Sequence, residues 1–151
     1  MNKSKKEFPL KKLLKYRKYQ LDKAKLEYQD QLNICRDIKN NIEKNYELKK
    51  KLEMEIYIKQ SHGISVSEII SYMDYLKNLE GQIIIFNDNL KKAESMLDLK
   101  FKQLVKSLQD KKSLELQDKK FFENYKKYIL KKEQKILDEI NSNRFIISMR
   151  N

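Results

Sequence analysis

The chain has 151 residues, of which 37% are charged and 40% are hydrophobic, and only two are glycine and one is proline. Sheets, barrels and sandwiches need many tight turns that draw on glycine and proline, so this composition excludes them and favours long helices. The formal net charge of +12 is spread along the whole chain. Such a distribution is typical of a solvated helix surface. A surface for a nucleic acid, an anionic membrane or an acidic protein partner is the second interpretation.

The sequence contains no stretch that predicts membrane insertion or secretion. Its longest apolar block, Ile83 to Phe86, has four residues, far fewer than the roughly 20 that span a bilayer. The first residues, MNKSKKEF, are basic, but no apolar signal core follows them. We therefore expect neither a transmembrane segment nor export by the secretory route.

A seven-residue repeat predicts a first helix over about residues 10–60. Pro9 suits the first turn of this helix, where its missing N–H costs nothing. The repeat and its companion series, offset by three or four residues, define a stripe along one helix face, called here the seam. The repeat runs through Leu14, Leu21, Tyr28, Cys35, Ile42, Lys49 and Ile56. The companions, half of them polar, are Leu10, Arg17, Ala24, Gln31, Ile38, Asn45, Leu52 and Lys59.

The pattern stops at KQSHGISVSE, which predicts a turn over residues 61–65. Gly63 can adopt the left-handed conformation that ends a helix. Ser65 and Glu68 have the spacing of a capping box, which begins a new helix. His62 lies in this turn, and because the chain has no second histidine, we interpret it as a solvated side chain and not as a metal ligand.

A second helix is predicted over about residues 65–143, with a frayed C-terminus after it. Gly81 lies outside its seam and costs about 1 kcal/mol of helix stability. Beyond Leu97 the apolar residues Phe101, Leu104 and Leu108 suggest a shift to an 11-residue spacing. The seam up to that point consists of Ile69, Tyr72, Leu76, Leu79, Ile83, Phe86, Leu90, Ala93 and Leu97, and its two series continue to Lys100, Leu104 and Ser107.

Together these elements predict an all-α fold: an antiparallel two-helix coiled-coil hairpin, formed by residues 1–151 as a single domain, with a longer second helix that overhangs the first. The short turn makes the two helices antiparallel neighbours. The overhang carries apolar residues that the first helix is too short to cover, which indicates a partner. These residues are Phe121, Phe122, Tyr125, Tyr128 and Ile129.

No residue pattern predicts catalysis, a metal site or a cofactor. The acidic residues alternate with lysines at spacings that support a helix, and a two-helix hairpin offers no enclosed pocket in which a pKa could be shifted. Cys35 is the single cysteine and occupies a seam position, so we interpret it as a small core residue in preference to a reactive thiol. We expect a protein that is not an enzyme.

Two segments resemble the FliJ family of flagellar export proteins, together with the basic start that enters the first helix near Phe8. The first is GISVSEIISYMDYLKNLEGQI, and the second is KKEQKILDEINSNR near the end of the chain. The family's helix start is matched by Gly63, Ile64, Ser65, Tyr72, Leu79 and Glu80. Its closing motif is matched by Gln134, Lys135, Asp138 and Glu139.

The resemblance implies a stalk similar to the central gamma subunit of rotary ATP synthases. Its terminal end would enter the pore of a hexameric export ATPase, and its hairpin side would contact the cytoplasmic linker of the membrane export gate. The ATPase regulator and export chaperones would be further partners. Such a protein is cytoplasmic and peripheral at the inner face of the cell membrane. For the ATPase, the resemblance implies contacts at Gln134, Lys135, Asp138, Glu139 and Arg144.

For the gate, the resemblance implies a patch with one group of residues before the turn and one after it. Leu79 matches the family, Leu48 and Leu52 replace tyrosines, and Gln82 and Phe86 depart from its pattern. Leu48 and Tyr75 lie outside the seam and are the stronger candidates for contact. Seam packing is the competing interpretation for Asn45, Leu52, Leu79 and Phe86. The full implied patch is Asn41, Asn45, Leu48, Leu52, Tyr75, Leu79, Gln82 and Phe86.

Two other functions fit a basic coiled coil. A nucleic-acid-binding protein would neutralise phosphates with its lysines, but here 22 acidic residues are interleaved with 34 basic ones, which disfavours it. A self-associating scaffold, such as a parallel dimer of long helices, is disfavoured by the reversal predicted at Gly63 and Ser65.

Overall fold

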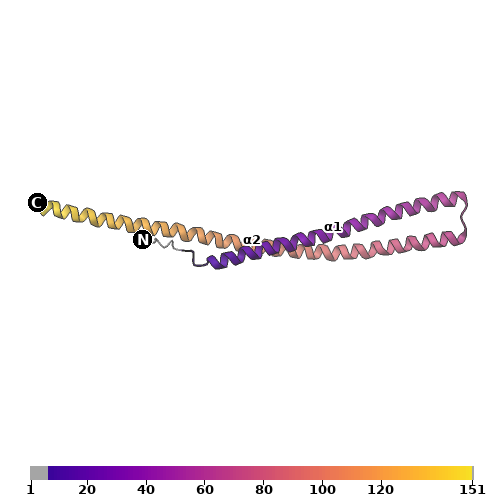
Figure 1. The fold of residues 1–151 in the computed structure, drawn as a ribbon, viewed down its shortest axis with the longest axis horizontal. Helices are drawn as coiled ribbons and strands as arrows, with labels where there is room; N and C mark the ends of the chain where they lie inside the picture. Colours follow the sequence, from indigo (N-terminus) through magenta and orange to yellow (C-terminus); the bar gives the residue numbers. More distant parts are fainter. Residues whose placement is uncertain (1–6, 151) are drawn as a thin grey trace. The chain divides into compact units, whose positions relative to one another are not determined.

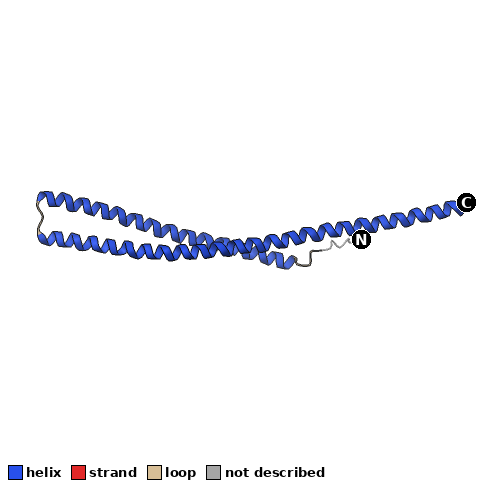
Figure 2. Cartoon of the chain, turned by 180° about the vertical axis from the view of Figure 1, so that it is seen from behind, coloured by secondary structure: helices blue, strands red, loops and turns tan. Residues whose placement is uncertain are grey.

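The computed structural model describes residues 7–150. It contains two helices, α1 over Lys11–His62 and α2 over Val66–Arg150, of 52 and 85 residues. Figures 1 and 2 show them joined by one short turn, with no strand in the described part of the chain. The two helices pack against each other, which confirms the predicted all-α hairpin with a longer second helix.

The chain separates into two compact units, each made from parts of both helices. The unit that contains the turn is Asp22–Lys106, and the other combines Met1–Leu21 with Ser107–Asn151. We call them the turn unit and the terminal unit and describe each by itself.

The start of α1 lies in the terminal unit and differs in detail from the prediction. The amide of Lys11 donates to the carbonyl of Phe8 over 3.1 Å, which closes a turn with Pro9 at its second position. Proline favours that position because its ring fixes φ near the value the turn requires. Pro9 therefore precedes the helix and does not lie in its first turn.

In the turn unit, the reversal between the helices has the predicted left-handed glycine and one of the two hydrogen bonds of a capping box. Gly63 has a φ of 83°, in the left-handed region that favours glycine. The hydroxyl Oγ of Ser65 accepts a hydrogen bond from the amide of Glu68 over 3.3 Å, and the carbonyl of Ser65 accepts one from Ile69 over 3.1 Å. Ser65 is therefore the N-cap of α2.

The core of the turn unit follows the predicted seam. Leu52, Ile56 and Leu79 form a buried cluster, against which Tyr72 and Leu76 pack. Cys35 is buried and has a free thiol, as expected of a small core residue. Further buried seam residues of this unit are Ala24, Ile42, Ile83 and Ala93.

The expected shift of the seam after Leu97 is wrong. Phe101 and Leu108 are exposed, whereas the unshifted series remains at least half-buried. That series contains Lys100, Ser107, Leu114 and Phe121, with Leu104, Lys111, Asp118 and Tyr125 as companions. Long lysine side chains can cover a seam with their aliphatic stems while the ammonium reaches water. Apolar residue type was therefore a poor guide to the seam in this part of α2.

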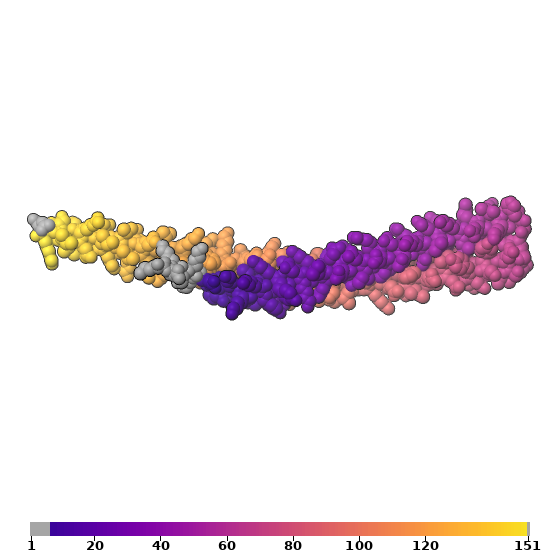
Figure 3. All heavy atoms as spheres, viewed as in Figure 1, coloured from indigo at the N-terminus to yellow at the C-terminus, as the bar shows by residue number. Residues whose placement is uncertain are grey.

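The last part of α2 has no covering helix. Every residue from 131 to 150 is exposed, and in Figure 3 no described segment of the terminal unit lies against the yellow end of the helix. The helix continues to Arg150, beyond the end expected near residue 143. We call residues 131–150 the bare end.

Candidate functional site

The residues that the resemblance implied for gate contact separate into buried and exposed groups. Leu52 and Leu79 are only 6% and 4% exposed and belong to the core cluster of the turn unit. Leu48 and Tyr75 are 44% and 50% exposed. Gln82 is also exposed and Phe86 is half-buried. Leu48, Tyr75 and Gln82 are therefore accessible to a partner, whereas Leu52 and Leu79 hold the two helices together.

The exposed members of this group share one side of the hairpin. Asn41, Leu48, Tyr75 and Gln82 each immediately precede a seam residue of the seven-residue series. In an antiparallel helix pair, residues at this position on both helices flank the same side of the seam. We call the surface formed by Asn41, Leu48, Tyr75 and Gln82 the tip face.

A shallow groove beside Tyr75 is lined by residues of both helices, which supports the placement of the tip face on one side of the hairpin. It has a volume of about 470 Å³, and its lining includes Glu55 and Lys59 from α1 and Glu68 and Tyr75 from α2. Glu55 and Glu68 occupy the same heptad position as Leu48 and Tyr75. Polar groups from both helices therefore meet beside the aromatic ring of Tyr75.

Lys59 and Tyr72 form a polar contact at this groove. The ammonium of Lys59 donates to the Tyr72 hydroxyl and lies 4.8 Å from the centre of its ring. The pKa of Lys59 is raised above its ordinary value of 10.5, first by this hydrogen bond and then by the charge interaction with Tyr72. Stability from a raised lysine pKa is present below the unfolded value and is lost only as the pH rises through the folded value. The contact is therefore insensitive to pH near neutrality.

Polar contacts between the helices fix the register of the turn unit. Lys100 bonds Glu27 over 3.2 Å, and the Gln31 side chain donates to the carbonyl of Ala93 over 3.0 Å. Lys49 pairs with Glu80 at 3.5 Å. Gln31, Lys49 and Lys100 are seam residues, so these pairs hold one alignment of the helices and disfavour slipped ones.

Asn45 is the exception to this pattern. Its Nδ2 is buried and has no hydrogen-bond partner among residues 7–150. Burying a donor without a partner costs about 1–3 kcal/mol, so Asn45 weakens the seam directly beneath the tip face.

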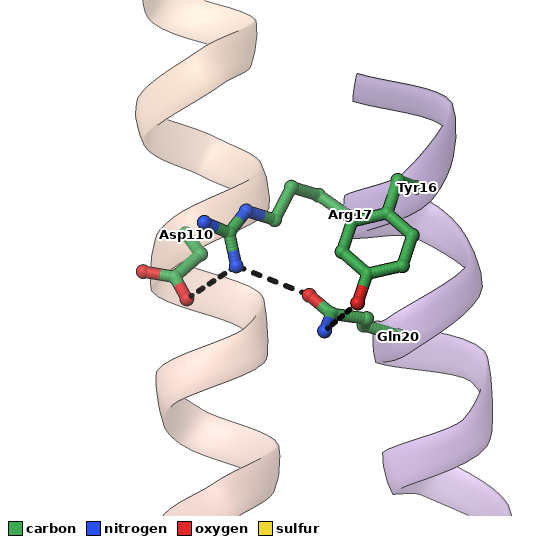
Figure 4. A network of polar contacts seen from close by, with 4 residues as sticks. All are labelled: Tyr16, Arg17, Gln20 and Asp110. Atoms are coloured by element: carbon green, nitrogen blue, oxygen red, sulfur yellow. Dashed lines mark hydrogen bonds and ion pairs between the residues drawn. The ribbon is translucent and has the colours of Figure 1, made fainter. Parts of the chain in front are cut away.

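In the terminal unit, a polar network joins the two helices. Figure 4 shows Arg17 donating from Nη1 to Asp110 Oδ2 over 3.3 Å and to Gln20 Oε1 over 3.1 Å. The amide of Gln20 donates in turn to the Tyr16 hydroxyl over 3.0 Å. The sequence placed Arg17 in the seam but did not identify Asp110 as its partner.

Near the start of α1, Phe8 covers part of the apolar surface that was expected to be bare. Its ring centre lies 5.8 Å from that of Phe121 in an edge-to-face arrangement, and Phe121 contacts Phe122 in the same way at 5.5 Å. Phe8 and Leu114 are buried, whereas Phe122 and Tyr128 remain exposed. Of the residues expected to be uncovered, Phe121, Tyr125 and Ile129 are thus half-buried, and only Phe122 and Tyr128 are exposed.

The residues that the resemblance implied for ATPase contact all lie in the bare end and are exposed. The Gln134 amide donates to Asp138 Oδ1 over 3.1 Å, an interaction between successive turns of one helix. The structure brings these two side chains together and leaves the other three separate on the helix surface. The exposed five are Gln134, Lys135, Asp138, Glu139 and Arg144.

Residues 7–150 contain neither a candidate metal cluster nor a membrane-spanning helix. Within residues 7–150, no group of three or more His, Cys, Asp or Glu side chains is placed to hold a metal ion. In the same range, neither helix has an apolar stretch sufficient to cross a membrane.

Comparison with known protein families identifies the family of the chain. No curated protein and no solved structure is similar enough to the chain to be matched. The family model described as "Flagellar FliJ protein" matches residues 5–150, which is nearly the whole chain and includes both helices and the turn between them. The chain therefore belongs to the FliJ family of flagellar proteins.

Proposed function

We propose that this chain is a non-catalytic stalk of the flagellar type III export apparatus, which links the hexameric export ATPase to the membrane export gate. It acts in the cytoplasm, peripheral to the inner face of the cell membrane through its partners. In this role it also contacts the ATPase regulator and export chaperones and aids chaperone recycling. Membership of the FliJ family supports the broad role in flagellar export.

The observation that carries the proposal is the separation of roles at the hairpin tip. Leu52 and Leu79 stabilise the helix pair, so Leu48 and Tyr75 are free to face a partner without any rearrangement of the core. Tyrosine combines a large apolar ring with a polar hydroxyl and is enriched at protein interfaces. Two large exposed side chains on one side of the hairpin are consistent with a gate-binding surface.

The bare end supports the ATPase half of the proposal. Its charged residues include both signs, with Lys135 and Arg144 as cations and Asp138 and Glu139 as anions. A single helix with mixed charge and exposed isoleucines, such as Ile136, is suited to insertion between surrounding subunits that cover its apolar face.

The test compares binding of purified variants to the cytoplasmic linker of the export gate. Leu48→Ala and Tyr75→Ala should each weaken binding about fivefold or more, because truncation of an interface anchor costs more than about 1 kcal/mol. Tyr57→Ala is the matched control, since Tyr57 is exposed but lies outside the seam and the tip face. Thermal melting of all three variants should be nearly unchanged.

The same variants should bind the hexameric ATPase normally, whereas charge reversal at Asp138, Glu139 or Arg144 should impair the ATPase and spare the gate. Wild-type gate binding by both tip-face variants would remove the argument for a gate contact there. If neither set of changes affects motility or export, the stalk proposal is wrong.

A further inference from the structure

A second groove lies in the terminal unit, on the side of the seam where Phe122 is exposed. Its apolar lining includes Phe8, Leu14 and Phe122, and its volume is about 720 Å³. That volume falls within the range of about 300–1,000 Å³ that is typical of ligand sites. We call it the lysine groove, because lysines form much of its lining.

Four lysines line the groove, against two carboxylates. Lys11 pairs with Glu7 at 3.4 Å, so its charge is partly compensated. Lys15, Lys18 and Lys126 also line the groove, and within residues 7–150 no ion pair joins any of them to an acidic side chain. An apolar floor is therefore surrounded by three uncompensated cations.

Asp118 supplies the other carboxylate and is incompletely paired. It occupies a seam position in the groove lining, and its Oδ1 is buried with no hydrogen-bond partner among the described residues. A buried acceptor without a donor costs free energy that the helix pair alone does not recover.

Charge decides between the possible occupants. A second copy of this chain carries a net charge of +12, and the chain's own first six residues include Lys3, Lys5 and Lys6, so both would be repelled by the lysines of the groove. An anionic membrane has the right charge but presents a flat surface, whereas the apolar residues here line a concavity.

We infer that the lysine groove binds an acidic amphipathic helix of a partner protein. The apolar face of that helix packs on Phe8, Leu14 and Phe122, and its carboxylates pair with Lys15, Lys18 and Lys126. This is helix-in-groove recognition with charged residues at its edges. The groove shares no residue with the tip face or the bare end, so the inference goes beyond the proposed coupling function and does not depend on it.

The test is direct binding to the purified full chain. The probe is a fluorescein-labelled helical peptide of about 14 residues, or four turns, with leucine on one face and glutamate on the other. Fluorescence anisotropy should show saturable binding that weakens with added salt. A peptide with lysine in place of glutamate should bind with an affinity lower by about tenfold or more. Self-association of the chain should not reduce the binding of the acidic peptide.

Two pairs of variants identify the site. Lys15→Glu with Lys18→Glu should weaken binding about tenfold, whereas Lys50→Glu with Lys51→Glu, which removes equal charge from exposed positions in the turn unit, should change it little. Phe122→Ala should weaken binding, and Leu116→Ala, at an exposed position outside the groove, should not. Circular dichroism melts establish that the variants are folded.

Specific outcomes would overturn the inference. If both lysine double variants lose the same affinity for the acidic peptide, binding depends on net charge and not on the groove. If the acidic and basic peptides bind equally, the lysines have no role in recognition. Stronger competition by anionic vesicles than by unlabelled peptide, lost in the same groove variants, would assign the surface to a membrane. A concentration-dependent dimer lost on Phe122→Ala would assign it to a second copy.

Discussion

The two glycines have opposite roles, although each occurs in a long helical pattern. Gly63 adopts a left-handed conformation that a side chain resists, whereas Gly81 is helical and a Cβ added there would meet nothing within 4 Å. Gly63→Val should therefore destabilise the chain by about 1–3 kcal/mol. Gly81→Ala should stabilise it by up to about 1 kcal/mol, because alanine loses less backbone entropy in a helix.

Urea unfolding of both glycine variants checks this contrast. The midpoint should fall for Gly63→Val and rise for Gly81→Ala relative to the wild type. A loss of stability in Gly81→Ala would show that this face of α2 is packed more closely than the structure indicates.

At the scale of the helix, adjacent residues of α2 provide a sharp comparison. Ile83 is 6% exposed and faces α1, whereas Ile84 is 64% exposed. Ile83→Ala should cost about 2–5 kcal/mol through lost burial and the cavity that remains. Ile84→Ala should stay within about 0.5 kcal/mol of the wild type, as expected of a surface position. Denaturant melts of the two variants measure both values, and similar costs for the two would contradict the seam alignment.

At the same scale, the sequence predicts the seam between the helices over only part of its length. Between Leu14 and Leu97 the seam was predictable because its apolar residues alternate regularly at heptad spacing. Beyond Leu97 it was predictable only in part, because the series reached Lys100, Leu104 and Ser107 but missed Lys111 and Asp118. The expected Phe101 and Leu108 are exposed. The hydrophobicity of a residue predicts its burial only where nonpolar side chains fill the interface. Charged side chains can occupy seam positions instead.

The candidate surfaces were predictable only in part. The sequence separated Leu48 and Tyr75 from the seam, and the structure shows both exposed. It did not reveal the lysine groove, because that groove joins Phe8 and Lys15 to Phe122 and Lys126, and only the register of the two helices brings these residues together. Register in turn depends on pairs such as Arg17 and Asp110, whose partners no local pattern identifies.

At the scale of the whole molecule, the hairpin predicts contacts within one chain. In a Cys35→Ala background, Arg17→Cys with Asp110→Cys should be joined by a short crosslinker within a monomer, because the native side chains are 3.3 Å apart. Arg17→Cys with Asp138→Cys is the control, since the bare end lacks a covering helix. Denaturing electrophoresis separates the products, and crosslinks formed only between chains would support the parallel dimer.

The single short turn also has a consequence for folding. The contacts between helices join residues that are 13 apart at Lys59 and Tyr72, 73 apart at Glu27 and Lys100, and 93 apart at Arg17 and Asp110. Closing a chain segment costs more entropy as it lengthens, so pairing that starts at the turn and proceeds outward keeps each new closure short. During synthesis α1 emerges complete before any of α2, and most helical stability in proteins comes from packing of an apolar face. We therefore expect the pairing of the helices to begin next to Gly63 and to proceed outward. The terminal unit should be the last part of the molecule to form.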